Sequence, residues 1–246
     1  MIYWNLWMIR SFWACWIVVD YFLKWCQDSF LSLNVSKTKD MCIDFRRSHP
    51  SPNSTVIDGQ DVEIVESYKY LGTKIDNKLT FESNTNKIYK KSQQRLFCLR
   101  KLSKFQVDSS LMTMFYHAFI ESVITFSFIC WFSSLRVKQK NVLNKVVKVC
   151  SKITGSALKT LQDLYNKQLH KKAESILSDC SHPLHQQFQF LPSGSLLRLP
   201  LAKTNRYKHS FVPSAISLLT SSRKRGKVFW LIDFIYFTLL LYYCMV

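Results

Sequence analysis

The chain has 246 residues and is strongly basic, with 34 Lys and Arg against 16 Asp and Glu and a formal net charge of +18. This length allows one or two domains with a buried core, and the charge favours polyanions: nucleic acid first, an anionic membrane surface second. The eight cysteines show no CxxC spacing, which indicates buried free thiols in an intracellular, reducing compartment rather than a disulfide framework.

Residues 1–19 form an apolar segment rich in aromatic side chains. Arg10 interrupts it, no signal-peptide cleavage site follows, and the run 11–19 is too short to span a bilayer. Residues 21–31 have the pattern of an amphipathic helix that packs on a sheet.

Residues 20–78 predict a small antiparallel sheet. Residues 41–45 alternate with a period of two, as a strand does. Asp58 and Gly59 stand between two β-branched runs, which predicts a hairpin because both residues tolerate positive φ. A third strand is expected over residues 68–75, with a kink at its glycine.

Residues 79–177 predict a helical bundle, whose first helix covers residues 85–103. The cations at the start of this helix have no acid among them: Lys87, Lys90, Lys91 and Arg95. Like charges four residues apart repel, so this unrelieved basic face indicates a surface that follows a nucleic-acid backbone. An ordinary solvated helix face is the alternative.

The second helix of the bundle, residues 110–131, is expected to start at a cap on Asp108 or Ser109. It is apolar nearly all round, which predicts the central core helix. We interpret its i,i+4 pair, His117 and Glu121, as core or rim polar residues and not as metal ligands.

Two further helices are expected over residues 136–154 and 158–177. The first of them turns Lys148 and Lys152 outward and stops at Gly155. Phosphate contacts from such a basic exterior would give sequence-independent, salt-sensitive binding.

Residues 178–222 form a basic, loop-rich region, with an extended loop over 191–201 and a short helix over 212–219. Three potential zinc ligands cluster in it without a fourth partner: Cys180, His182 and His185. We therefore predict no metal site, and nothing in the sequence calls for a cofactor.

The tail, residues 223–246, begins with a basic flank and continues as an apolar run over 228–246, in which Asp233 is the one charge. Its length is close to that of a membrane-spanning helix, and the basic flank suits a cytosolic side. A C-terminal membrane anchor is one hypothesis. The other hypothesis is that these residues are unrelated sequence, translated past the end of an older reading frame, that happens to be apolar.

Two motifs resemble a known family. Residues 33–39 (Leu-Asn-Val-Ser-Lys-Thr-Lys) and 68–72 (Tyr-Lys-Tyr-Leu-Gly) resemble the region just after the catalytic aspartates in reverse transcriptases of LINE-type, non-LTR retrotransposons. The similarity extends over about residues 20–220. It implies the end of a palm, a primer-grip hairpin and a helical thumb.

The resemblance also implies roles for particular residues. Lys37 and Lys39 would lie near the incoming nucleotide, and Tyr70, Leu71 and Gly72 would grip the primer. The thumb-like helices would bind RNA or a DNA–RNA duplex through six cations: Lys87, Lys90, Lys91, Arg95, Lys148 and Lys152.

The polymerase centre of that family needs paired aspartates and a further aspartate upstream, which hold two metal ions. No Asp-Asp pair occurs in this chain. The sequence thus predicts a truncated, non-catalytic remnant with no catalytic residue.

Residues 84–127 also resemble the N-terminal domain of AlkB homologue eight, a tRNA-modifying protein with dioxygenase and methyltransferase domains. Those activities need a His-x-Asp iron motif and a Gly-rich turn. This chain has neither, because no histidine precedes an aspartate by two positions and its five glycines are isolated.

The sequence as a whole predicts an α+β protein with apolar segments at both ends. The main hypothesis is a nucleic-acid-binding remnant of a reverse transcriptase. The alternatives are a basic, membrane-anchored interaction protein, a protein classified by its AlkB-homologue domain without either catalytic domain, and a relic without a selected function. The oligomeric state is not predicted.

Overall fold

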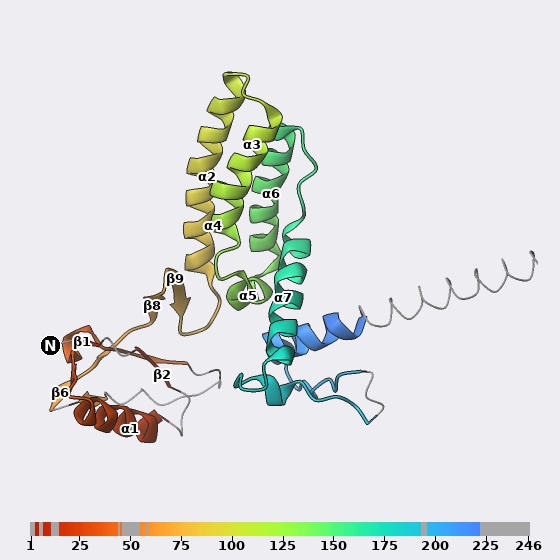
Figure 1. The fold of residues 1–246 in the computed structure, drawn as a ribbon. Helices are drawn as coiled ribbons and strands as arrows, with labels where there is room; N and C mark the ends of the chain where they lie inside the picture. Colours follow the sequence, from red (N-terminus) through yellow and green to blue (C-terminus); the bar gives the residue numbers. More distant parts are fainter. Residues whose placement is uncertain are drawn as a thin grey trace, which may run out of the picture. The chain divides into compact units, whose positions relative to one another are not determined.

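The computed structural model describes residues 3–4, 7–10, 15–43, 45, 55–57, 59–192 and 196–221. The chain is α+β, as expected, with short strands in its first part and long helices in its second (Figure 1). It divides into two compact units, Met1–Lys87 and Ile88–Val246, with the boundary inside a helix.

The sheet of the first unit differs from the expected antiparallel one. Strand β4 (Lys39–Cys42) pairs in parallel with β2 (Trp7–Arg10) and β7 (Glu63–Ile64), and β1 (Tyr3–Trp4) pairs in parallel with β3 (Ser32–Leu33). For β2 with β4 and for β1 with β3, the reason is that helix α1 (Cys15–Asp28) lies between the two paired strands along the chain. Such a crossover returns the chain in its original direction, as parallel pairing requires.

The expected hairpin around Gly59 is confirmed. Strands β5 (Val56–Ile57) and β6 (Gln60–Asp61) are antiparallel, and Gly59 has a φ of 73° between them. Asp58 lies outside the described residues.

The prediction of a single strand over residues 68–75 is wrong. The chain forms a second hairpin there, with β8 (Ser67–Tyr70) antiparallel to β9 (Thr73–Asp76). Leu71 and Gly72 form the two-residue turn, with φ values of 43° and 90°. Positive φ at both positions matches the right-handed twist of the flanking strands.

Helix α1 packs on the strands, as its amphipathic pattern predicts. Val19 of α1 is buried together with Leu33, Ile57 and Val62, and Phe22 packs against this cluster. The helix starts earlier than the expected residue 21 because Cys15 to Asp20 also belong to it.

The second unit is a bundle of helices that lie side by side (Figure 1). Helices α2 (Glu82–Lys104), α6 (Val137–Thr154) and α7 (Leu161–Ser178) confirm three predicted helices to within a few residues. Asp108 accepts a hydrogen bond from the Ser110 amide, 2.8 Å away, and thereby caps the next helix as expected.

The expected continuous helix over residues 110–131 is divided. It consists of α3 (Ser109–Phe115), a π-helical turn (Tyr116–Glu121), α4 (Ser122–Ile124) and α5 (Phe128–Trp131). Before α5, Ser127 has a left-handed φ of 50°, which stops the α-helix.

This segmented helix is also not buried all round. Its inner side holds Tyr116, Ile120 and Ile124, each fully buried. The apolar side chains of its outer side are exposed: Leu111, Met114, Phe119 and Phe126.

Aromatic side chains fill the core at one end of the bundle. Trp131 is fully buried, and its indole N–H donates to the Phe126 carbonyl at 2.9 Å. The ring of Phe128 lies 5.2 Å from that of Trp131, and Phe132 of the short 3-10 helix (Phe132–Ser134) lies 5.2 Å from Tyr165 of α7.

The described cysteines are free, in agreement with the sequence. Cys26 and Cys150 are buried, but Cys98 and Cys130 are exposed although both sit in apolar helical patterns. Burial raises the pKa of Cys150 to about 11, so this thiol stays protonated at neutral pH.

Short elements make up the rest of the second unit. They are the 3-10 helix His185–Gln187, a bridge between Phe190 and Leu197, α8 (Asn205–Lys208) and the helix Phe211–Ser221, which confirms the short helix expected over 212–219. The possible anchor at 228–246 lies outside the described residues.

No single helix among the described residues has the length and apolar composition to cross a membrane. One bent pair, Ser109–Ile124 and Phe128–Ser134, meets these criteria together, with an angle of 43° between its parts.

The aromatic core gives a stability prediction. Trp131→Ala should lower the free energy of unfolding by about 3–5 kcal/mol because it empties a large, fully buried site. Guanidinium unfolding followed by circular dichroism would measure this. Val137→Ala is the control, since Val137 is 73% exposed and its truncation should cost less than about 0.5 kcal/mol. Equal losses in the two variants would contradict the assigned core.

Candidate nucleic-acid interface

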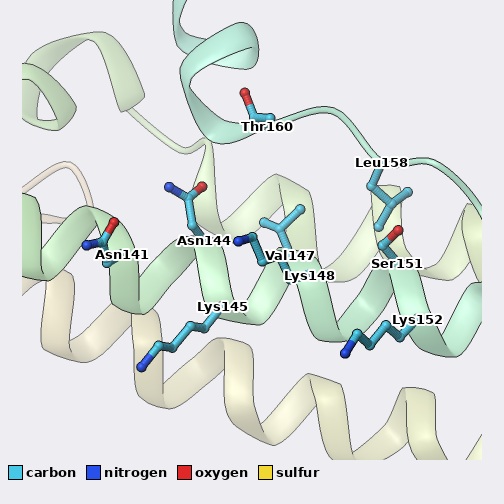
Figure 2. Close-up of a pocket in the computed structure, with 9 residues that line it drawn as sticks. All are labelled: Asn141, Asn144, Lys145, Val147, Lys148, Ser151, Lys152, Leu158 and Thr160. Carbon is cyan, nitrogen blue, oxygen red and sulfur yellow. The ribbon is translucent and has the colours of Figure 1, made fainter.

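An open groove of about 680 Å³ runs along one side of α6. We call it the α6 groove, and Figure 2 shows the nine side chains that line it: Asn141, Asn144, Lys145, Val147, Lys148, Ser151, Lys152, Leu158 and Thr160.

Helical spacing brings the cations of the groove together. Lys145, Lys148 and Lys152 are separated by three and four residues, so they share one face of α6. The opposite face holds the buried side chains, among them Leu143 and Cys150. In Figure 2, Lys145 and Lys152 extend from the same side of the helix.

The second wall of the groove comes from the segment that follows α6. Gly155 ends α6 with a φ of 68°, which glycine adopts without steric cost, and the chain then turns back beside the helix. Figure 2 shows Leu158 and Thr160 of this segment near α6. Thr160 also caps α7, because its hydroxyl accepts from the Asp163 amide at 3.2 Å.

The positive charge of the groove is not compensated. Lys145, Lys148 and Lys152 are exposed and form no ion pair with any described residue. Over residues 88–221 there are 20 Lys and Arg and only five Asp and Glu. No carboxylate lines the groove.

Those five carboxylates are held by near neighbours in the sequence. Their contacts are Asp108 with Ser110, Glu121 with His117, Asp163 with Thr160, Glu174 with His170, and Asp179 with Ser181. Hydrogen bonds from Ser110 lower the pKa of Asp108, and those from Ser181 lower that of Asp179. The five acids are therefore committed to local contacts rather than to the lysines.

The chemistry of the groove is that of binding. Ammonium groups and the side-chain amides of Asn141 and Asn144 can donate to phosphate oxygens. The Ser151 hydroxyl already donates to the Ser156 carbonyl at 2.6 Å. The lining includes no histidine, carboxylate or thiol to act as a general base or nucleophile.

Of the six predicted phosphate-contacting residues, the groove brings together Lys148 and Lys152. Lys145 was not among the six, although its spacing of three residues from Lys148 places it on the same face.

The other four predicted cations lie on α2. Lys90 and Lys91 are exposed, and Lys87 is half-buried. Arg95 is half-buried, and its guanidinium donates to the Phe119 carbonyl in the π-helical turn.

The predicted site residues of the first unit lie in two separate segments of the chain, one around residues 37–39 and one at the β8–β9 hairpin. Lys37 is exposed at the end of a 3-10 helix (Val35–Lys37), whereas Lys39 forms an ion pair with Glu63 of β7. Tyr70, Leu71 and Gly72 lie at the tip of the β8–β9 hairpin.

No group of three His, Cys, Asp or Glu side chains within the described ranges could hold a metal ion. The two histidines of the supposed zinc cluster make local contacts instead. His182 Nδ1 accepts from the Leu184 amide at 3.1 Å, and His185 Nδ1 lies 3.0 Å from the Ile176 carbonyl. His117 Nδ1 lies 3.0 Å from Glu121.

Residues 81–122 match one family model, described as the N-terminal region of alkylated DNA repair protein alkB homolog 8. The match takes in α2, α3 and the π-helical turn, and leaves most of the chain uncovered. No curated protein and no solved structure matches the chain. The resemblance to a LINE-type reverse transcriptase thus gains no support from these comparisons and stays a hypothesis.

The strained turn at Leu71 can be tested. Leu71 has a positive φ, which is strained for leucine, and its side chain is 77% exposed, so replacing it loses little packing. Leu71→Asn should therefore stabilise the β8–β9 hairpin by about 1 kcal/mol, because asparagine tolerates this conformation better. Native-state hydrogen exchange of the β8 and β9 amides would measure the gain. Leu71→Ala is the matched control, because alanine lacks the short polar side chain whose local hydrogen bonds let asparagine adopt positive φ. Equal protection in both variants would contradict the strained turn.

Proposed function

We propose that the helical unit binds nucleic acid through the phosphate backbone, without reading sequence. One observation carries this proposal: the α6 groove presents Lys145, Lys148 and Lys152 on one helix face with no carboxylate in its lining. Lysines act on phosphates as flexible point charges, so such a surface binds RNA and DNA of any sequence.

The charge balance of the unit supports a polyanion rather than a protein partner with mixed charges. With 20 Lys and Arg against five acids, the unit attracts anions over its whole surface. A duplex or single strand gains by releasing counterions from its phosphates, and this gain falls as salt rises.

The family match gives a second, weaker support. The matched family is named after a DNA repair protein, and the matched residues include Lys87, Lys90, Lys91 and Arg95. We infer a binding role alone, because the iron and methyl-donor motifs are missing from the sequence.

The descent of the chain from a reverse transcriptase remains part of the proposal. Its support is that the Tyr70-Leu71-Gly72 motif forms a hairpin tip, which is where the resemblance places the primer grip. Without paired aspartates, primer extension is not expected.

Membrane anchoring is the rival proposal, supported by the apolar run 228–246 beside a basic flank. Cell fractionation of the chain with and without residues 227–246 distinguishes this proposal from nucleic-acid binding. An anchor predicts that the full chain sediments with membranes and the shortened one does not.

The α6 groove gives a direct test. In fluorescence anisotropy with a labelled 20-nucleotide RNA, the triple variant Lys145→Gln, Lys148→Gln, Lys152→Gln should bind at least about 10-fold more weakly at 100 mM salt. The slope of log affinity against log salt should become shallower by about 2–3.

The control removes the same charge from α7, where Lys167, Lys171 and Lys172 are exposed. Changing these three to glutamine should alter the affinity less than threefold. If both triple variants weaken binding equally, net charge alone is responsible and the groove is not the site. Extension of a primed template with magnesium and nucleotides present would contradict the non-catalytic assignment.

A further inference from the structure

A second pocket, of about 490 Å³, lies within the helical unit. Its lining comes from the 3-10 helix Phe132–Ser134, the first turn of α6, the first half of α7 and the helix Phe211–Ser221. Its volume falls in the range of small-molecule sites. We call it the α7 pocket and define it by six of its lining residues: Lys140, Tyr165, Asn166, His209, Ser214 and Ser217.

Lys140 brings a positive charge to this pocket without a counter-charge. The side chain is half-buried and forms no ion pair with any described residue. No aspartate or glutamate lines the pocket. Burial lowers the pKa of Lys140, because the charged form loses part of its water there. An anion beside the ammonium would replace that lost water, so the pocket favours an anionic ligand.

Neutral hydrogen-bond donors surround this charge. Ser214 and Ser217 are three residues apart, so they share one face of their helix, and neither hydroxyl bonds to a described residue. The side-chain amide of Gln162 donates to the Asn166 Oδ1 atom at 3.0 Å, which leaves the Asn166 amide N–H groups available. Both hydroxyls and this amide can therefore donate to an anion in the pocket.

Tyr165 is the one buried polar residue of the lining. Its side chain is 5% exposed, and the Ser133 hydroxyl lies near its hydroxyl but not in hydrogen-bonding geometry. Burial raises the pKa of Tyr165, so its hydroxyl stays protonated and remains a donor at neutral pH. A buried hydroxyl without a partner is unfavourable, and a ligand oxygen that reached it would remove that cost.

We propose that the α7 pocket binds a small phosphomonoester, with its phosphate beside Lys140 and its organic group against Leu169 and Leu218. A phosphate offers several oxygens, which suits an ammonium and separate single donors. A carboxylate is best held by the paired N–H groups of an arginine, and the lining contains no arginine. This site is distinct from the α6 groove and does not depend on the proposed nucleic-acid binding.

The test is isothermal titration calorimetry of the full chain with phenyl phosphate, a monoester with a small apolar group. We expect a Kd of about 0.1–1 mM, as suits a ligand of this size. Inorganic phosphate should bind at least about threefold more weakly, because it leaves the apolar lining in water. Benzoate should bind at least about 10-fold more weakly, because a carboxylate offers fewer oxygens to the donors.

Two lysines of the first turn of α6 give a matched pair of variants. Lys140→Gln should weaken phenyl phosphate binding at least about 10-fold. Lys138→Gln removes the same charge at an exposed position outside the lining, so it should change the affinity less than about twofold. The double variant Ser214→Ala, Ser217→Ala tests the facing helix and should weaken binding at least about threefold.

Three results would overturn the proposal. The first is no binding of phenyl phosphate up to about 10 mM, and the second is equal affinity for benzoate. The third is equal weakening by Lys138→Gln and Lys140→Gln, because net charge would then be responsible. The glutamine triple variant of the α6 groove should keep its affinity for phenyl phosphate; if it binds no phenyl phosphate, the ligand lies in that groove and the α7 pocket is not the site. RNA binding is measured separately, so the failure of either proposal leaves the other intact.

Discussion

The packing of aromatic rings between α5 and α7 is the contact on which the helical unit depends. Phe128 and Phe132 both approach Tyr165 of α7, at 6.0 Å and 5.2 Å between centroids. The ammonium of Lys140, on the first turn of α6, lies 4.8 Å from the Phe132 ring centroid, and burial lowers the pKa of this lysine. The cluster thus ties the segmented helix, α6 and α7 together. Because α7 is held there, the return segment with Leu158 and Thr160 stays beside α6 and completes the groove.

The second organising constraint is electrostatic. Asp108 and Asp163 stabilise the starts of α3 and α7, and Glu121 and Glu174 pair with histidines one helical turn away, so these acids leave the cations unneutralised. Self-repulsion of this charge opposes the compact state, and the aromatic core has to offset it. A bound polyanion would remove the repulsion, and the folded chain would gain stability through the ligand.

The sequence predicted those features that local patterns determine. Apolar periodicity predicted the three long helices. Asp108 marked the start of α3, Gly155 marked the end of α6, and Lys148 and Lys152 are exposed on α6 as expected. Features set by distant or unusual residues were missed. Parallel pairing of two- to four-residue strands leaves no local signal, and leucine at a positive-φ turn position is not a typical hairpin residue. The left-handed Ser127 likewise looks like any serine, and the exposed rings of the segmented helix carried the pattern of a core.

The π-helical turn Tyr116–Glu121 has a consequence for how this chain tolerates changes in length. A π-helical turn holds one residue more than an α-helical turn over the same stretch of axis. Removal of one residue there would restore a regular α-helical turn and leave the helical segments on either side in their present relative orientation. Removal of a residue from a regular α-helix would instead rotate every later side chain by about 100° relative to the earlier ones. Ile124 would therefore stay in the core after a deletion within the turn, whereas a deletion within α3 would turn it out of the core. Within this helix, the π-helical turn is thus the one place where the loss of a single residue leaves the buried face intact.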